Sequence, residues 1–354
     1  MTEDDETLSA RIAVRGRGTG ELAKGRFERL GVEYAQEDAR QVETQVFIDS
    51  SRSILSFNDS PDVGFSASLN PYRGCEHGCI YCYARPTHEY LGLSAGLDFE
   101  TKIFAKMEAP ELLRAELQKK SWKPQAIAVS GVTDCYQPIE RKLEITRRCL
   151  QVLAECRNPA VIITKNILVT RDIDILSELA AYQAVRVVLS ITTLDKDLAR
   201  FMEPRASTPA LRLKAIEELS KAGIPVSVNM APIIPGLTDH EIPALLKAAG
   251  NAGAQKAHYT MVRLPYGVKD LFQAWLDEHY PTRKQKVLNR IKDVRGGKLY
   301  SAEFGSRMQG EGIYAEHIAQ LFTNARKKYG LDKKSAPLST GHFKRPQGAQ
   351  LSLL

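Results

Sequence analysis

The sequence between Asn70 and Ala84 is N-P-Y-R-G-C-E-H-G-C-I-Y-C-Y-A, and it contains three closely spaced cysteines. Cys75, Cys79 and Cys82 follow the pattern C-x3-C-x2-C. Cysteine thiolates are the preferred ligands of iron–sulfur clusters, and four of them saturate a 4Fe–4S cluster. Three cysteines leave one iron without a protein ligand, and by analogy with catalytic zinc a substrate or cofactor would bind there. The spacing therefore favours a reactive cluster.

Structural zinc is the alternative for this loop. Zinc sites usually show paired C-x2-C units or a later pair of histidines, and the loop contains a single C-x2-C. His77 is a candidate fourth ligand, but inside so tight a loop its ring would struggle to face the same metal. Gly74 and Gly78 fit a loop whose backbone turns sharply and approaches a cluster closely. We favour iron–sulfur and keep zinc as the alternative.

The composition predicts an ordinary soluble protein with a sizeable core. The chain has 354 residues, of which 43% are hydrophobic and 26% charged, values typical of globular domains. No apolar run is long enough to span a bilayer, and the acidic start, residues 1–6, does not resemble a secretory signal. The six cysteines form no disulfide-scaffold pattern, as expected in a reducing compartment. We therefore expect a cytoplasmic protein without a membrane partner, and the oligomeric state stays open.

Apolar, partly β-branched runs alternate with helical patterns along the middle of the chain. We expect strands near 65–69, 126–130, 161–164, 185–191, 226–230 and 258–262, with helices from about 109 and at 141–156, 172–182, 209–222 and 238–250. Hydrophobic strands joined by crossover helices form a parallel sheet. Six such units predict an α/β fold, a partial (β/α)6 TIM-like barrel with N- and C-terminal extensions. The expected divisions are residues 1–60, a partly flexible extension; 61–265, the barrel; and 266–354, a basic helical extension.

Polar residues follow the predicted strands where each strand ends. In barrels of this type the chemistry gathers at the C-terminal ends of the strands. Beyond the cysteine loop, these positions are Gly131, Thr133 and Asp134, Lys165, Ser190, Asn229 with Pro235 and Gly236, and Arg263. The sequence therefore predicts one polar edge that shares its cavity with the cysteines.

The cysteine motif, with Tyr81 before its third cysteine, resembles the signature of the radical S-adenosylmethionine enzymes. Three further motifs are similar to the branch that contains the DNA repair photolyases, spore photoproduct lyase among them: T-D-C-Y-Q-P-I-E (133–140), I-T-K-N (163–166) and A-P-I-I-P-G-L-T-D (231–239). With E-P-R-A (203–206) and R-M-Q-G-E-G (307–312), the chain looks closest to an uncharacterised bacterial group of this branch. The resemblance covers roughly residues 60–320.

This resemblance implies two cofactors, a 4Fe–4S cluster and S-adenosylmethionine. The amino and carboxylate groups of S-adenosylmethionine would chelate the open iron, and one-electron reduction would release a 5′-deoxyadenosyl radical. The electron would come from a reductant such as flavodoxin or ferredoxin. The residues implied to contact S-adenosylmethionine are Tyr81 and Pro235-Gly236 at the adenine, Gly131, Thr133 and Asp134 at the amino group, Ser190 at the ribose and carboxylate, and Arg205 at the carboxylate.

Each of these residues has a structural alternative. Asp134 could cap the following helix, Ser190 could satisfy local backbone groups, and Glu203 and Arg205 could pair with each other. Three further residues are candidates for the chemistry itself: Cys135, Tyr136 and Lys165.

The related repair lyases return a hydrogen atom from a cysteine, and Cys135 is a candidate for that role. Simple packing is its alternative, and relatives commonly carry proline at this position. Tyr136 would face the substrate or belong to the core. Lys165 would line the cavity rather than form a Schiff base, because nothing in the sequence marks its pKa as lowered.

The C-terminal part of the chain is basic. Residues 282–298 contain seven Lys or Arg and one acidic residue, Asp293, within a net charge of +7 for the whole chain. Such a segment can bind a phosphate backbone, and nearby aromatic residues can stack on bases. A solvated surface helix is the alternative. The resemblance implies a radical enzyme, and the expected reaction is lyase-type repair or modification of nucleic acid. The alternatives are radical modification of a small molecule or peptide, and a non-catalytic iron–sulfur or zinc module that binds nucleic acid.

Overall fold

A seven-stranded sheet forms the centre of the molecule. The computed structural model describes residues 16–20, 23, 26–27, 42–334 and 336–347. The sheet has the order β10-β9-β8-β7-β6-β3-β2. All neighbouring strands are parallel except β2, which is antiparallel to β3. The strands are β2 (Leu55–Phe57), β3 (Ala67–Leu69), β6 (Ile127–Val129), β7 (Ala160–Thr164), β8 (Val185–Ser190), β9 (Val226–Ile233) and β10 (Lys256–Met261).

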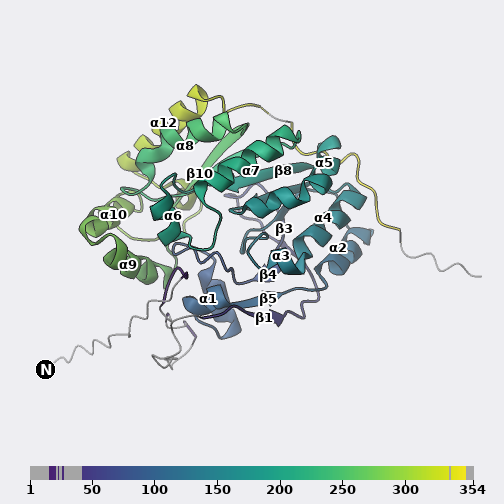
Figure 1. Cartoon of the computed structure of the whole chain (residues 1–354), viewed down its shortest axis with the longest axis horizontal. Helices are drawn as coiled ribbons and strands as arrows, with labels where there is room; N and C mark the ends of the chain where they lie inside the picture. Colours follow the sequence, from purple (N-terminus) through teal and green to yellow (C-terminus); the bar gives the residue numbers. More distant parts are fainter. Residues whose placement is uncertain (1–15, 21–22, 24–25, 28–41, 335, 348–354) are drawn as a thin grey trace, which may run out of the picture.

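Helices cover the outer face of this sheet (Figure 1). They are α2 (Ala109–Gln118), α3 (Glu140–Leu143), α4 (Ile145–Cys156), α5 (Ile173–Ala181), α6 (Lys196–Met202), α7 (Pro209–Lys221) and α8 (Ile242–Asn251), with 3-10 turns at Ile167–Asp172 and Asp239–Glu241. Helix α4 shows why they pack there. Its buried residues recur at helical spacing, with Cys149, Leu150, Leu153 and Cys156 on the core side.

The predicted partial barrel is confirmed. All six predicted strands form, in the predicted order, as β3 and β6 to β10. Within the described residues, the sheet does not close, because β10 and β2 are its two edges. Since parallel strands run the same way, their C-terminal ends meet at one side of the sheet.

A second, three-stranded sheet lies beside the first and was not predicted. It has the order β1-β5-β4, built from β1 (Gln45–Ile48), β5 (Lys102–Ala105) and β4 (Tyr72–Arg73). The cysteine loop leaves β4 directly, and the chain then forms a 3-10 helix, η2 (Arg85–Leu91), and α1 (Leu97–Thr101). Both β1 and β2 precede residue 60, so strands of the N-terminal part pair with the rest of the fold.

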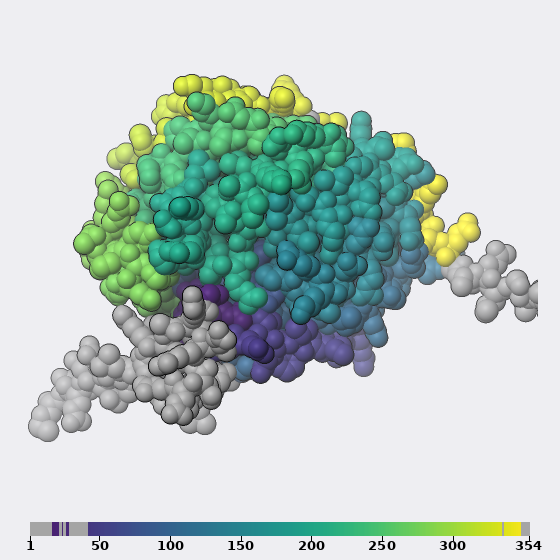
Figure 2. Space-filling model, in the orientation of Figure 1, coloured from purple at the N-terminus to yellow at the C-terminus, as the bar shows by residue number. Residues whose placement is uncertain are grey.

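The C-terminal part packs against the barrel. It consists of α9 (Val268–His279), α10 (Pro281–Asp293), α11 (Ser306–Gln309) and α12 (Ile313–Lys328). Helices α9 and α10 form a second apolar core with Ile80 and Tyr81 of the cysteine loop, whereas α12 packs on α8. In Figure 2 these green and yellow segments continue the surface of the teal barrel. Among the described helices, none has the length and apolarity needed to cross a membrane.

Candidate active site

The three cysteines of the loop lie in the wall of one cavity of about 670 Å³. The other walls come from the ends of the parallel strands: Ser130–Asp134 after β6, Ile163–Lys165 from β7, Ser190 from β8, Asn229, Ala231 and Pro232 from β9, and His258–Met261 with Arg263 from β10. The polar strand ends and the cysteines therefore share one cavity.

The environment of the cysteines fits a cluster better than a single metal ion. Cys75 and Cys79 are buried, Cys82 is half-buried, and all three thiols are free. Burial raises the pKa of the Cys75 thiol and raises the pKa of Cys79 to about 12, so these thiolates require a cation beside them. Among the described residues, no three His, Cys, Asp or Glu side chains are grouped to hold one metal ion. A 4Fe–4S cube instead binds each cysteine on a different iron.

Both ring nitrogens of His77 have protein partners, which argues against its role as a zinc ligand. Nδ1 lies 3.4 Å from the Asp134 carboxylate, and Nε2 lies 3.2 Å from the Asn166 side-chain amide. His77 is 1% exposed. The ring therefore connects the cysteine loop to the ends of β6 and β7.

The buried guanidinium of Arg85 holds the cysteine loop from below. Its five N–H groups donate to the carbonyls of Cys79 (3.0 Å), Gly78 (3.2 Å), Ala95 (3.2 Å) and Gly96 (2.9 Å) and to the Glu100 carboxylate (2.5 Å). Arginine has five donors, so the loop backbone and one carboxylate satisfy all of them. The turn itself depends on Gly78, which has φ +64° and whose missing Cβ would lie 2.5 Å from Glu100 Oε2.

Asp134 connects two strand ends and does not cap a helix. Its carboxylate accepts hydrogen bonds from the Thr164 hydroxyl (2.7 Å), the Lys165 amide (2.7 Å) and the Tyr136 amide (2.9 Å). Burial alone would raise the pKa of Asp134, but His77 and these donors lower it to about 2. The carboxylate is therefore ionised and fixed at the cavity wall.

A buried ion pair holds Tyr81. Glu203 and Arg212 form a salt bridge, and Glu203 accepts hydrogen bonds from the hydroxyls of Tyr81 and Thr192. Burial alone would raise the pKa of Glu203, but Arg212 and Lys165 lower it to about 2. The motif E-P-R-A thus contributes a carboxylate whose partner is Arg212 on α7, and not Arg205.

Lys165 and Asn229 present polar groups to the cavity. Burial lowers the pKa of Lys165, but the Cys79 and Glu203 charges outweigh burial and raise it. The Lys165 ammonium therefore stays charged, 5.8 Å from the centre of the Tyr81 ring. Asn229 Oδ1 is buried without a hydrogen-bond partner among the described residues. A buried oxygen without a hydrogen-bond partner destabilises the fold unless a ligand or water donates a hydrogen bond to it. The position of Asn229 Oδ1 therefore fits a site that binds a cofactor.

The chain closes the open side of the barrel with a contact that we call the latch, formed by residues 305–307 and 60–62. The Arg307 guanidinium pairs with Asp62 and donates to the Ser60 hydroxyl (2.7 Å), and the Gly305 amide donates to Asp62 (2.7 Å). Helix α11, which carries Arg307, packs beside β10. The latch therefore connects the β10 edge to the β2–β3 hairpin across the cavity.

A family model described as the radical SAM superfamily matches residues 69–249. The chain belongs to the radical SAM superfamily. Its relatives include an uncharacterised protein of Mycobacterium tuberculosis, 35% identical over 279 residues that make up 78% of each chain. Another is an uncharacterised protein of Methanocaldococcus jannaschii, 27% identical over 233 residues, 66% of this chain and 83% of the relative.

Solved structures of spore photoproduct lyase share the fold of this radical SAM protein. One is a mutant with bound AdoMet and dinucleoside spore photoproduct, with a TM-score of 0.58, 14% identity and 85% coverage of each chain. Another is the lyase complexed with dinucleoside spore photoproduct, with a TM-score of 0.57, 13% identity, and coverage of 83% of this chain and 81% of the lyase. The predicted recognition is confirmed. The cofactors are a 4Fe–4S cluster and S-adenosylmethionine, as expected.

Five of the eight residues predicted to contact S-adenosylmethionine line the cavity, and three do not. Tyr81, Gly131, Thr133, Asp134 and Ser190 line it, as does the catalytic candidate Lys165. Arg205 does not, because it lies 3.1 Å from Glu76 in an ion pair outside the cavity. Pro235 and Gly236 also lie outside the cavity wall, and Gly236 packs against Arg290 of α10.

Cys135 and Tyr136 are fully buried and do not line the cavity. The Cys135 thiol points to the Val129 carbonyl at 3.6 Å, and the Tyr136 hydroxyl donates to Asp172 at 2.9 Å. Their placement favours the packing alternative for both. Sequence reasoning missed Tyr83, whose ring lines the cavity directly after Cys82. Its position beside the cysteine motif was the available signal.

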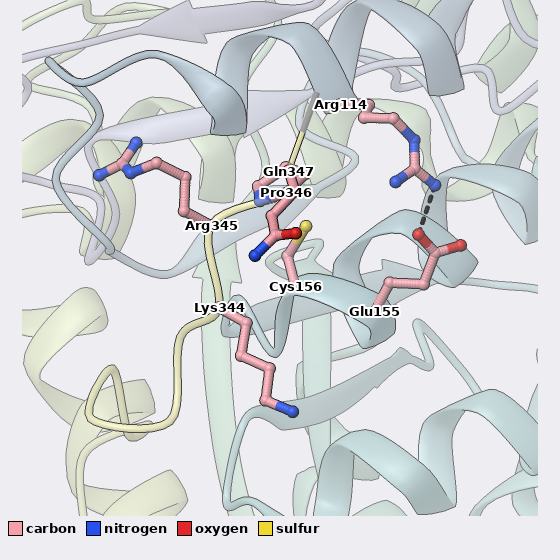
Figure 3. A pocket seen from close by; sticks show the side chains of 7 residues that line it. All are labelled: Arg114, Glu155, Cys156, Lys344, Arg345, Pro346 and Gln347. Carbon is pink, nitrogen blue, oxygen red and sulfur yellow. Dashed lines mark hydrogen bonds and ion pairs between the residues drawn. The ribbon is translucent and has the colours of Figure 1, made fainter. Parts of the chain in front are cut away.

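A second hollow, of about 540 Å³, lies between α2, α4 and the C-terminal segment 344–347 (Figure 3). Arg114 and Glu155 form an ion pair on one side of it, beside Cys156. None of its lining residues lines the cysteine cavity.

Proposed function

We propose that this radical SAM enzyme acts on nucleic acid, in a lyase-type repair or modification reaction. One observation carries the proposal. The cavity that contains the cysteines continues to a wall formed by Tyr83 and Arg263, which suits a base beside a phosphate. The chain shares its fold with spore photoproduct lyase, which has been solved with a bound dinucleoside spore photoproduct, and this likeness supports the same substrate class.

Within the cavity, we assign roles by position. Cys75, Cys79 and Cys82 would hold the cluster, and Asn229 and Lys165 would hold polar groups of S-adenosylmethionine. When both cofactors are bound, they supply a 5′-deoxyadenosyl radical, and the protein contributes position and electrostatics. Ionised Asp134 and charged Lys165 fix opposite charges at the two neighbouring strand ends β6 and β7, so they can orient a ligand that carries both an ammonium and a carboxylate.

The wall of the cavity that Tyr83 and Arg263 form suits an anionic aromatic substrate. The Arg263 guanidinium lies 5.2 Å from the centre of the Tyr83 ring, and its buried Nε has no hydrogen-bond partner among the described residues. A guanidinium binds phosphate with two parallel N–H donors, and a tyrosine ring stacks on bases irrespective of sequence. Together they provide contacts for one nucleotide unit.

Helix α10 offers a docking surface for the rest of a polyanion. Arg283, Lys286 and Lys292 are exposed on it, whereas Lys284 and Arg290 are paired with Asp277 and Asp293. Each phosphate contact adds affinity that falls with salt. We therefore propose that α10 binds the backbone while the cavity receives the reacting nucleotide.

Radical SAM enzymes need a reductant. We propose a flavodoxin or ferredoxin as the electron donor, in the cytoplasm, where thiols stay reduced.

The proposal is tested with cluster-loaded protein, dithionite and S-adenosylmethionine under anaerobic conditions. We expect 5′-deoxyadenosine to form, and we expect ultraviolet-irradiated DNA, native DNA or RNA to show altered nucleosides by mass spectrometry after digestion. If 5′-deoxyadenosine forms but no nucleoside changes in any of them, the substrate is a small molecule or peptide. If a fully loaded preparation forms no 5′-deoxyadenosine, the non-catalytic module is the better description.

Docking is measured separately, by fluorescence anisotropy of labelled DNA at several salt concentrations. Changing Arg283 and Lys286 to Glu should weaken binding and reduce the salt slope by about 2, one for each lost phosphate contact. The matched control is Lys221→Glu, on α7 and paired with Glu217, which should leave binding unchanged. Equal effects of the two variants would refute docking on α10.

A further inference from the structure

The N-terminal strap, residues 16–20 of the motif R-G-R-G-T-G, lies directly against the cysteine loop. A Cβ on Gly18 would lie 1.7 Å from the Gly78 carbonyl oxygen, and a Cβ on Gly78 would lie 3.2 Å from the Gly18 nitrogen. Real Cβ atoms essentially never come within 1.7 Å of another heavy atom, and 3.2 Å is a tight contact, so the two backbones leave no room for a side chain on Gly18 and little for one on Gly78. The contact between the strap and the cysteine loop therefore depends on glycine at both positions, 18 and 78.

Hydrogen bonds attach the strap to the support of the loop. The Gly18 amide donates to the Glu100 carboxylate at 2.8 Å, and the Arg17 guanidinium donates to the Glu100 carbonyl at 2.9 Å. Glu100 is the fully buried partner of Arg85, which holds the carbonyls of Gly78 and Cys79. The strap, Glu100 and Arg85 thus form one continuous connection to the segment between the first two cysteines.

A second connection reaches the same segment at Glu76. Arg17 donates to the Thr44 hydroxyl at 3.1 Å, and this hydroxyl donates to the Glu76 carboxylate at 2.7 Å. Arg205 pairs with Glu76 at 3.1 Å and donates to Thr44 at 3.2 Å. The network of hydrogen bonds that includes the strap therefore reaches two of the three residues between Cys75 and Cys79, Glu76 and Gly78.

We propose that the N-terminal strap belongs to the cluster site. The strap fixes the turn between Cys75 and Cys79, and its charge helps to set the reduction potential of the bound cluster. The positions of both cysteines depend on the backbone between them. Groups that support metal ligands commonly change metal affinity by about 10–100-fold when they are removed.

The charges around the turn give the strap its electrostatic effect. Arg17, Arg85 and Arg205 bring three positive charges to this turn, and Glu76 and Glu100 bring two negative ones. Reduction adds an electron to the cluster, and net charge and hydrogen bonds near a cluster set its potential. Removal of the Arg17 charge should therefore make the cluster harder to reduce.

The first experiment uses Gly18→Ala, with Gly341→Ala as the matched control, since a Cβ at Gly341 meets nothing closer than 3.7 Å. We expect Gly18→Ala to lose iron to a chelator about tenfold faster than wild type, and to bleach faster in air, with an unchanged far-ultraviolet circular dichroism spectrum. The control should match wild type. Wild-type iron loss and bleaching in Gly18→Ala would overturn the positioning role.

The second experiment measures the midpoint potential of the cluster in Arg17→Ala and Arg17→Lys by anaerobic dye-mediated titration. Arg17→Ala should shift the midpoint to a more negative potential. Arg17→Lys keeps the positive charge, so its midpoint should stay close to that of wild type. A purely structural role would not produce this charge dependence, so equal midpoints in wild type and Arg17→Ala would overturn the electrostatic role. Neither measurement uses nucleic acid, so both are independent of the proposed substrate.

Discussion

Replacing Arg85 by methionine removes the charge beneath the cysteine loop while keeping a side chain of similar length. Arg85 and Glu100 are both fully buried, and all five donors of the guanidinium are used. Breaking a buried pair by removing one partner costs about 3–5 kcal/mol, because the remaining charge is left uncompensated. We expect this loss in the free energy of unfolding of the cluster-free protein.

Urea unfolding followed by circular dichroism measures this loss. For a slope of about 3 kcal/mol per M, the midpoint should fall by about 1–2 M. The control is Arg114→Met, which removes the same side chain from an exposed pair with Glu155 and should cost at most about 1 kcal/mol. The double variant Arg85→Met/Glu100→Gln should recover part of the loss, since it leaves no unpaired charge. A loss below about 1 kcal/mol in Arg85→Met, or strict additivity in the double variant, would refute the reasoning.

Three further predictions concern the cluster, the cofactor and pH. Cys82→Ala should leave iron at background after anaerobic reconstitution, measured by a colorimetric iron assay; wild-type iron content would contradict a ligand role. Asn229→Ala should weaken S-adenosylmethionine binding about tenfold, the effect of one lost hydrogen bond of about 1.4 kcal/mol, in equilibrium dialysis; unchanged binding would remove Asn229 from the site. Burial lowers the pKa of His88 from 6.5 to about 4 despite its bond to the Lys102 carbonyl, so the unfolded chain binds the proton more readily. The free energy of unfolding of the cluster-free protein should fall by up to about 3 kcal/mol as pH falls from 6.5 to 4. In urea titrations, His88→Phe should show a weaker pH dependence than wild type. The same pH dependence in wild type and His88→Phe would contradict this role of His88.

The strands and the polar edge of the barrel could be predicted because their signals are local and periodic. Runs such as 185–191 are apolar over a full strand, and β8 forms there as Val185–Ser190. The strand-end rule then placed Asp134, Lys165, Ser190 and Asn229 in one cavity wall. The small sheet was missed because its strands are short and β1 is exposed along its whole length, so it has no hydrophobic alternation.

The partners of the site residues could not be predicted from the motif alone. Glu203 and Arg205 are close in sequence, yet they pair with Arg212 and Glu76 respectively, because the turn after α6 sends them to different sides. Cys135 directly follows Asp134 but points into the core. The glycines of the strap gave no periodic signal, since the role of Gly18 is the absence of a side chain beside Gly78.

The latch has a consequence for shortened forms of this enzyme. A chain that stopped before Gly305 would still contain all three cysteines and every strand of the main sheet. It would lack Arg307 and the bonds to Ser60 and Asp62 that bridge the open side of the barrel. Such a product would also lose the part of the cavity wall that Arg307 and Met308 form, so premature termination there would leave the cysteine cavity open to bulk water.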